Sequence, residues 1–172
     1  TEARVRVSVY MSYPKADKLE HVIQKATELG AYEIVAFPSA RCISRPDEKS
    51  LAKKIERWQK IALGAAQQSR RGIVPEVKPM VTLKEAAEKA KSDDVSIVFY
   101  EGGGESLGVL LKDGPKSVSI FIGSEGGFSQ READMMVEKG AVNIVLGSRI
   151  LRCETAAVTA ASLVMFSLGQ LE

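Results

Sequence analysis

Two glycine-rich turns in the second half of the chain constrain its fold more than any other feature. The first turn, IGSEGGF, covers residues 122–128 and ends the apolar run SVSIFI; the second, LGSRILRCET, covers residues 146–155 and follows the apolar run AVNIVL. An apolar run, a glycine turn and a helical pattern in succession predict a strand, a ligand loop and a helix. In open α/β sheets such loops lie at the carboxyl ends of parallel strands, where ligands bind.

The composition of these turns narrows the class of ligand. Glycine has no Cβ, so the backbone can adopt positive φ and a ligand can approach the main chain closely. The glycines in question are Gly123, Gly126, Gly127 and Gly147. Neither turn has the Gly-Lys-Ser/Thr ending of a P-loop or the G-x-G-x-x-G order of a dinucleotide-binding fold. Glu125 would also repel a phosphate. The turns therefore favour a cationic or neutral polar ligand.

The rest of the chain alternates between strand and helix patterns, which predicts a mainly parallel α/β sheet flanked by helices. Trp58 lies on the apolar stripe of the longest helix and is expected in the core, and Thr82 is expected to cap a helix. The expected strands cover residues 5–11, 32–37, 78–80, 95–100, 117–122 and 141–146, with a short extended piece at 41–44; the expected helices cover residues 16–29, 49–69, 83–91, 130–139 and 154–168.

Composition excludes several classes of protein. A chain of 172 residues with 45% hydrophobic content can bury a full core. Cys42 and Cys153 lie far apart in the sequence, and His21 is the one histidine, so neither a zinc site nor a disulfide framework is expected. No apolar run approaches the roughly 20 residues that a membrane-spanning helix needs. These features predict a soluble cytoplasmic protein with no metal and no membrane partner.

The net charge of the chain does not indicate a function, but the basic residues are unevenly distributed along the sequence. A net charge of +2 does not by itself indicate a nucleic-acid-binding protein. Basic side chains nevertheless gather on one helical segment and its exit, at Lys49, Lys53, Lys54, Arg57, Lys60, Arg70 and Arg71. They could follow RNA phosphates, or they could form a solvated helix surface with acidic neighbours such as Glu48 and Glu56. The residues alone favour the solvated surface.

Several long motifs in the same order resemble one family, the SPOUT (trefoil-knot) methyltransferases, and within it the RsmE-type ribosomal RNA uridine-N3 methyltransferases. The motifs span nearly the whole chain: QKATELG at 24–30, ERWQKIALGAAQQSRR at 56–71, VPEV at 74–77, IGSEGGFSQRE at 122–132 and LGSRILRCETA at 146–156. Three positions depart from the family pattern. Cys153 stands where threonine is more frequent, Gln67 where glutamate is common, and Arg70 where glycine is frequent. None of these changes removes a chemically active group.

The resemblance has consequences for domain organisation. Family members usually begin with a small β-barrel similar to an RNA-binding PUA domain, whereas this sequence opens at Thr1 directly on the expected strand 5–11. The resemblance therefore implies a single SPOUT methyltransferase domain over residues 1–172, without the N-terminal PUA-like domain. It also implies a homodimer, to which Val158, Leu163 and Phe166 of the last helix could contribute surface.

In the family, the chain forms a deep C-terminal trefoil knot that brings three glycine-rich loops around S-adenosylmethionine. The resemblance thus implies a knot in the part of this chain that follows Val95. The residues implied in cofactor binding are Phe99, Tyr100, Glu101, Gly123, Glu125, Gly126, Leu146, Gly147, Ile150 and Leu151.

The same resemblance suggests which residues take part in methyl transfer. Uridine N3 is a poor nucleophile while it carries its proton, so alignment and stabilisation of the anion should dominate catalysis. Arg152 is the first candidate catalytic residue and Arg149 the second, because a guanidinium can hold a uracil carbonyl or a phosphate. The resemblance also favours RNA contacts by the basic residues, and the candidates are Lys25, Arg41, Arg57 and Arg71.

Two acidic residues near the turns have more than one interpretation. Glu125 could offset the sulfonium charge or accept from a neighbouring arginine, or it could cap the helix that starts near Ser129. Glu154, with Thr155, could orient one of the arginines or cap the last helix.

The resemblance predicts methylation of uridine N3 in small-subunit (16S) ribosomal RNA. Two alternatives remain open at the level of sequence. One is a SPOUT methyltransferase that acts on another RNA position. The other is a catalytically silent RNA-binding or ribosome-assembly module.

Overall fold

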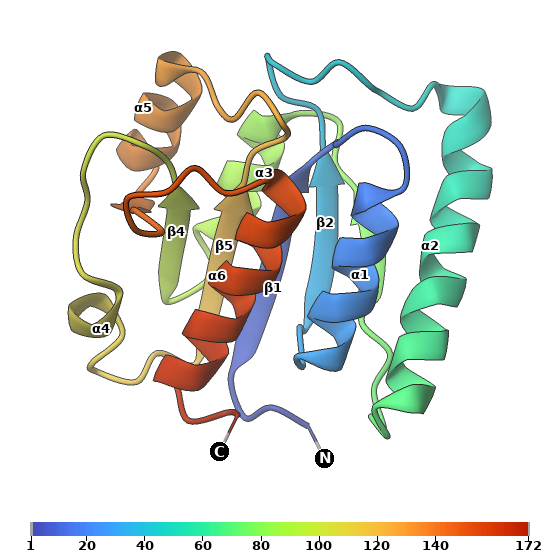
Figure 1. Ribbon diagram of the computed structural model, residues 1–172, viewed down its shortest axis with the longest axis horizontal. Coiled ribbons are helices and arrows are strands. Elements are labelled where there is room, and N and C mark those ends of the chain that lie inside the picture. The colour runs from blue at the N-terminus through green and yellow to red at the C-terminus, as the bar shows by residue number, and fades with distance from the viewer. Residues whose placement is uncertain (1, 172) are drawn as a thin grey trace.

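The computed structural model describes residues 2–171 and consists of one parallel sheet between two layers of helices (Figure 1). The strands lie in the order β3-β2-β1-β5-β4-β6, and each neighbouring pair is parallel. Their bounds are β1 (Arg6–Ser12), β2 (Glu33–Phe37), β3 (Glu76–Pro79), β4 (Val95–Phe99), β5 (Ser117–Ile122) and β6 (Val142–Ile144). The predicted α/β class with a mainly parallel sheet is confirmed.

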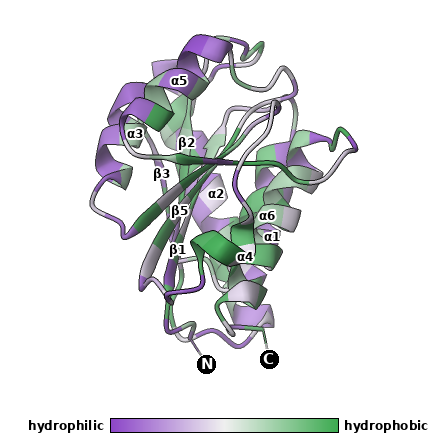
Figure 2. Cartoon of the chain, turned by 90° about the vertical axis from the view of Figure 1, so that its left-hand side faces the viewer, coloured by the Kyte–Doolittle hydropathy of each residue, from purple (hydrophilic) through white to green (hydrophobic). Residues whose placement is uncertain are grey.

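Successive side chains along a strand point to opposite faces of the sheet and pack into two separate hydrophobic cores. On β1, Val7, Val9 and Met11 face one core, whereas Tyr10 faces the other and stacks on Phe121 at 4.5 Å. The first core lies under α1 (Lys18–Glu28), α2 (Glu48–Gln68) and α6 (Cys153–Ser167); the second lies under α3 (Leu83–Ala90) and α5 (Gln130–Glu138). Figure 2 shows these two helical layers on either side of the sheet.

The elements follow the sequence-based expectations to within a few residues. Trp58 is 5% exposed, and the Thr82 hydroxyl accepts from the Glu85 N–H at 3.1 Å, as predicted. One short helix, α4 (Leu107–Leu110), was not expected, because four residues are too few for a periodic pattern. None of the helices among residues 2–171 is long and apolar enough to cross a membrane.

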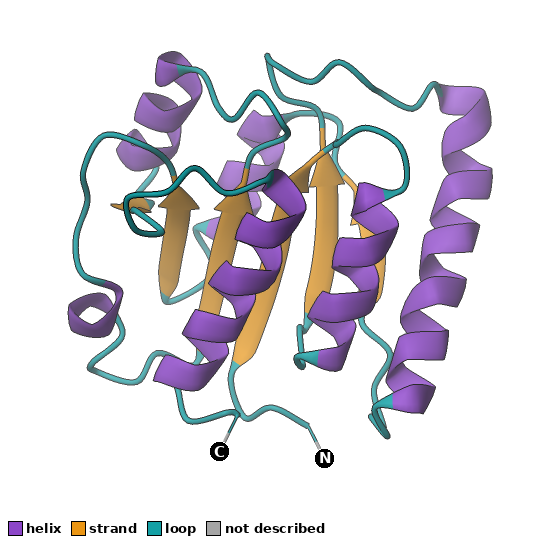
Figure 3. Cartoon of the chain, viewed as in Figure 1, coloured by secondary structure: helices purple, strands orange, loops and turns teal. Residues whose placement is uncertain are grey.

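The carboxyl ends of all six strands meet at one edge of the sheet, and the loops gather there (Figure 3). Because β4 lies between β5 and β6, the loops that follow these three strands are neighbours. The loop after β4 rests directly on β6: the Glu105 N–H donates to the Asn143 carbonyl at 3.1 Å. A Cβ on Gly104 would lie 2.2 Å from that same carbonyl oxygen, so this crossing requires glycine.

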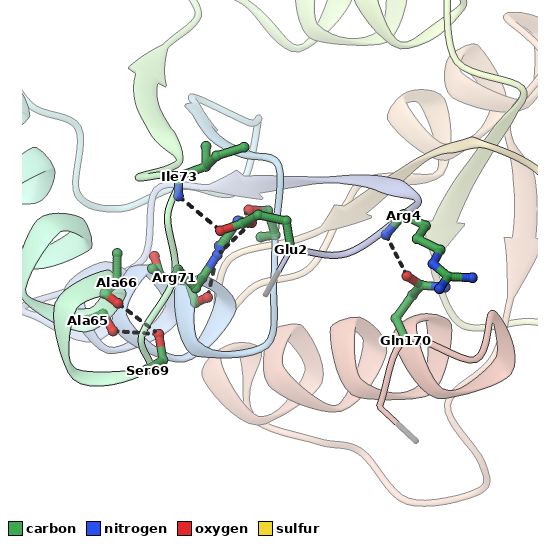
Figure 4. A network of polar contacts seen from close by, with 10 residues as sticks. Glu2, Arg4, Ala65, Ala66, Ser69, Arg71, Ile73 and Gln170 are labelled. Atoms are coloured by element: carbon green, nitrogen blue, oxygen red, sulfur yellow. Dashed lines mark hydrogen bonds and ion pairs between the residues drawn. The ribbon is translucent and has the colours of Figure 1, made fainter.

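The opposite edge of the sheet is closed by a polar network (Figure 4). The Arg71 guanidinium donates to the Glu2 carboxylate at 2.8 Å and to the carbonyls of Thr27 and Ala31 at 2.9 Å each. Arg70, at the position where the family frequently has glycine, adopts a φ of 59°. The chain therefore keeps the left-handed turn at the exit of α2 even without glycine there.

Candidate functional site

A cavity of about 720 Å³ opens at the carboxyl edge of the sheet. Its size is that of a site for a small organic ligand. The loops after β2, β4, β5 and β6 and the beginnings of α1 and α6 form its walls. The lining residues are Lys18, Arg41, Phe99, Tyr100, Glu101, Gly102, Ile122, Gly123, Ser124, Glu125, Gly126, Gly127, Phe128, Val145, Leu146, Gly147, Ser148, Arg149, Ile150, Leu151, Arg152, Cys153 and Ala156. All ten residues predicted to bind the cofactor, and both candidate catalytic arginines, are among them.

The glycines of the first turn serve two different purposes. Gly127 adopts a φ of 64°, which a side chain disfavours, but Gly123 and Gly126 do not have positive φ. Gly123 is required instead because a Cβ there would lie 2.8 Å from the Gly127 backbone. The expectation of positive φ is thus correct for Gly127 and Gly147 (75°), and wrong for the other two positions.

The loop between β2 and α2 packs against this turn and completes the cavity. The Arg41 guanidinium donates to the Gly126 carbonyl at 3.1 Å, and the Ala40 N–H donates to the Glu132 carboxylate at 2.6 Å. A Cβ on Gly126 would lie 2.9 Å from the Arg41 Cβ, so glycine permits this close approach. The extended piece predicted at residues 41–44 is wrong: the segment turns, with the Cys42 N–H donating to the Ser39 carbonyl, because its polar groups are used in this docking.

The second turn places two arginines on the wall of the cavity. Gly147 turns the chain, and Arg149 follows with an exposed side chain. Arg152 is the N-cap residue of α6, with φ of −62° and ψ of 150°, and is likewise exposed. Within residues 2–171, neither guanidinium forms an ion pair. Both therefore remain available to a ligand.

Lys18 links the two acidic residues whose roles the sequence left open. Its ammonium lies 3.0 Å from the Glu125 carboxylate and 3.6 Å from the Glu154 carboxylate. Glu125 therefore pairs with a lysine rather than an arginine. It does not cap α5, since the Ser129 hydroxyl accepts from the Glu132 N–H in a capping box. Glu154 likewise pairs with Lys18 instead of orienting either arginine.

The environment of Glu125 and Lys18 keeps both side chains charged at neutral pH. Burial alone would raise the pKa of the Glu125 carboxyl, but hydrogen bonds from the Lys15 N–H and the Lys18 ammonium bring it below its ordinary value. The hydrogen bond to Glu125 in turn raises the pKa of Lys18. The cavity wall thus carries fixed charges of both signs.

Cys153 also lies on the cavity wall, where its surroundings suppress the reactivity of its thiol. Burial, together with a hydrogen bond to Glu154, raises the pKa of its thiol to about 12. The thiol is therefore protonated at neutral pH and not nucleophilic. Among residues 2–171, no group of three or more His, Cys, Asp or Glu side chains could hold a metal ion.

The four residues predicted to bind RNA do not form one surface. Arg41 lies in the cavity, whereas the other three lie away from it. Lys25 pairs with Glu28 at 3.0 Å, and Arg57 pairs with Glu20 at 2.8 Å while remaining 69% exposed. The Arg71 side chain is 6% exposed within the network described above.

Among the lining residues that the sequence did not single out as site residues, Ser124 and Lys18 matter most for polar contacts. Ser124 is 5% exposed, and its hydroxyl has no partner within the described chain. Its position inside the first glycine turn was a signal that could have included it. Lys18 lies more than 100 residues from Glu125 in the sequence, so no local pattern could have predicted their contact.

Comparisons with known proteins agree with this geometry. A family model described as RNA methyltransferase domain matches residues 1–165. Ribosomal RNA small subunit methyltransferase E from Bacillus subtilis is 37% identical, over 96% of this chain and 67% of the relative; the protein of the same name from Mesomycoplasma hyopneumoniae is 36% identical, over 91% and 68%. The chain thus spans about two thirds of the length of these relatives.

Solved structures extend the likeness to proteins with a bound ligand. Ribosomal RNA small subunit methyltransferase E from Neisseria gonorrhoeae, bound to S-adenosyl methionine, has a TM-score of 0.87 and 31% identity, over 96% of this chain and 68% of that one. A methyltransferase from Legionella pneumophila with bound SAM has a TM-score of 0.89 and 30% identity, over the same shares.

Proposed function

The chain belongs to the family of RNA methyltransferase domains, and we propose that it transfers the methyl group of S-adenosylmethionine to N3 of a uridine in small-subunit ribosomal RNA. One observation carries the proposal. The loops after three neighbouring strands and the two arginines of the second turn line one cavity of about 720 Å³. The names of the similar proteins support the substrate class.

The cavity suits S-adenosylmethionine. Glycines leave main-chain groups accessible at Gly123 and Gly147, and the buried Ser124 hydroxyl has no partner within the described chain. Segments 99–101, 122–127 and 146–151 would hold the cofactor. When bound, the cofactor supplies an electrophilic methyl carbon for the transfer.

The arginines of the second turn would stabilise the reacting base. A guanidinium that donates to a uracil carbonyl favours the anion that forms as N3 loses its proton. Arg152 is the first candidate for this role, and its position as the N-cap residue of α6, a helix with a buried face, supports the assignment. Arg149 follows Gly147 in the same exposed turn and is the second candidate.

RNA phosphates would contact Arg41 and the exposed basic residues of α2. Arg41 joins the cavity to the loop that leads into α2, so an RNA strand on that helix would end at the site. Arg57 and Lys25 have carboxylate partners and would have to exchange them for phosphates. Arg71 is left out, because its guanidinium is already satisfied inside the protein.

The proposal includes a homodimer and a trefoil knot, in a cytoplasmic protein. Phe166 and Leu163 of α6 are 61% and 42% exposed and lie three residues apart, so they share one helix face and provide apolar surface that a second copy would cover. The placement of β4 between β5 and β6, with α6 returning over β1 and β5, supports the knot. Light scattering tests the dimer, and a monomeric mass at micromolar concentration would contradict it.

Methyl transfer itself is tested with radiolabelled S-adenosylmethionine and small-subunit ribosomal RNA, both free and in particles. Nuclease digestion and chromatography should identify 3-methyluridine. The Bacillus subtilis relative serves as the comparison enzyme under the same conditions. If the radiolabelled methyl group appeared in another nucleotide, the enzyme would methylate a different position of the RNA. Cofactor binding without transfer, on RNA that the comparison enzyme methylates, would favour the silent binding module.

A further inference from the structure

Lys18 occupies an unusual position between two hollows in the surface. It lines the cavity described above and also a second hollow of about 620 Å³ between α1, α2 and the beginning of α6. The carboxylates that it contacts lie on either side, since Glu125 lines the first hollow and Glu154 the second. The Lys18 side chain is therefore part of the wall between them.

The contacts of Lys18 connect three segments that are distant in the sequence. Lys18 is the first residue of α1, Glu125 belongs to the turn after β5, and Glu154 lies in the first turn of α6. The Lys15 N–H strengthens the link, because it donates to the same Glu125 oxygen at 2.9 Å. The Glu154 carboxylate also accepts from the Cys153 thiol at 3.3 Å. Both glycine turns of the site are thus tied to the beginning of one helix.

We propose that Lys18 is a positioning residue: its ammonium holds the turn after β5 and the start of α6 at the separation that the cofactor requires. The side chain is 27% exposed, so its energetic value for folding is small, as for most exposed ion pairs. Its value for binding is larger, since a ligand held by two loops loses affinity when either loop moves. The inference rests on the proposed function, because it takes S-adenosylmethionine as the ligand.

Repulsion between Lys18 and the ligand sulfonium would have the opposite sign, and this separates that explanation from positioning. S-adenosylmethionine carries a sulfonium cation and S-adenosylhomocysteine does not. If Lys18 acted only by repelling the sulfonium, removing it would tighten binding of S-adenosylmethionine alone. A direct contact with the carboxylate that both ligands carry would weaken both, and the double-mutant cycle with Glu125 below distinguishes that case, because such a contact does not require Glu125. If Lys18 positions the loops, removing it weakens binding of both ligands to a similar extent.

The experiment is isothermal titration of both ligands into the wild-type protein, Lys18→Met and the control Lys91→Met. Lys91, which directly follows α3, also pairs with a glutamate, Glu88 of that helix, at 3.1 Å, but lines neither hollow. We expect Lys18→Met to weaken both ligands about fivefold to tenfold. Lys91→Met should stay within about twofold of the wild type. Lys18→Arg, which keeps the charge and the donors, should recover most of the loss.

A double-mutant cycle shows whether Lys18 acts through Glu125. Glu125→Gln and Lys18→Met should together weaken binding no more than the worse single change. Glu154→Gln removes the contact between Lys18 and the start of α6, and it replaces Lys18→Met in the titrations if that variant does not fold. Affinities of Lys18→Met within about twofold of the wild type, or tighter binding of S-adenosylmethionine alone, would overturn the inference. A folded wild-type protein that binds neither ligand would instead reject the proposed function.

Discussion

Two carboxylates, one at each end of the strands, form ion pairs with lysines. The pair at the amino ends is expected to stabilise the fold, and the pair at the carboxyl ends is expected to support ligand binding. Glu33, at the amino end of β2, is 8% exposed and contacts both Lys78, at 2.7 Å, and Lys89. Glu125, at the carboxyl edge, is 28% exposed and shares Lys18 with Glu154.

The difference lies in what encloses each pair. At the amino edge, β3 and α3 supply the lysines and close over Glu33, so the charges are satisfied within the protein. At the carboxyl edge, glycine turns replace packed side chains and leave a cavity with two exposed arginines. Changes at Glu33 should therefore affect folding, and changes at the carboxyl edge should affect ligands.

The largest effect is expected from Arg152→Ala. Loss of one donor to a developing anion lowers the rate of catalysis by about 100-fold to 1000-fold. Affinity for S-adenosylmethionine should change little, because under the proposed function the cofactor is assigned to main-chain groups of the glycine turns. Single-turnover methyl transfer to ribosomal RNA, alongside calorimetry, measures both quantities. If cofactor affinity fell by the same factor as the rate of methyl transfer, Arg152 would belong to the cofactor site and would have no separate catalytic role.

Glu33→Gln tests the other edge. It removes the buried carboxylate that Lys78 and Lys89 share and leaves Lys78 with Glu76 alone, so the free energy of unfolding should fall by about 1–3 kcal/mol. Cofactor affinity should stay at the wild-type value. Urea unfolding and calorimetry provide the measurements. Weakened binding in a variant that remains folded would contradict the separation between the two edges.

The pH dependence of the free energy of unfolding tests the role of Glu33 in stability separately. Burial alone would raise the pKa of Glu33, but hydrogen bonds and charges from Lys78 and Lys89 hold it below its ordinary value. A carboxyl with a lowered folded-state pKa contributes stability above its unfolded pKa and loses it as the pH falls through the folded pKa. Wild-type stability should therefore drop below about pH 4.5 more steeply than that of Glu33→Gln, as urea titrations at several pH values would reveal.

A smaller effect is expected from Ser129→Ala at the start of α5. The change removes one half of the capping box with Glu132 and should cost about 1 kcal/mol. Because Glu132 also anchors Ala40, the loop of Arg41 should become more mobile. Thermal unfolding measures the stability, and hydrogen exchange of residues 39–42 measures the loop. Unchanged exchange there would show that the capping box does not hold the loop in place.

Most of the fold could be predicted from sequence because its signals are local. Alternating apolar runs predicted the strands, and Thr82 predicted the start of α3. The residues that the resemblance named for the cofactor line one cavity, because the glycine turns lie within continuous motifs. The Lys18 contacts and the docking of Arg41 on Gly126 could not be predicted, because they join segments that only the folded chain brings together. Arg71 shows the same limit: the resemblance favoured RNA contact for this residue, but Glu2 and two carbonyls enclose its guanidinium.

The central claim, that the carboxyl edge is a site for S-adenosylmethionine, is tested most directly by calorimetry of the wild type beside two glycine variants. A Cβ at Gly123 would lie 2.8 Å from the Gly127 backbone and must displace the turn, whereas a Cβ at Gly64 in α2 meets no atom within 4 Å. Micromolar binding by the wild type and by Gly64→Ala, with loss in Gly123→Ala, is the predicted result. No binding by the folded wild type, or equal binding by Gly123→Ala, would contradict the claim.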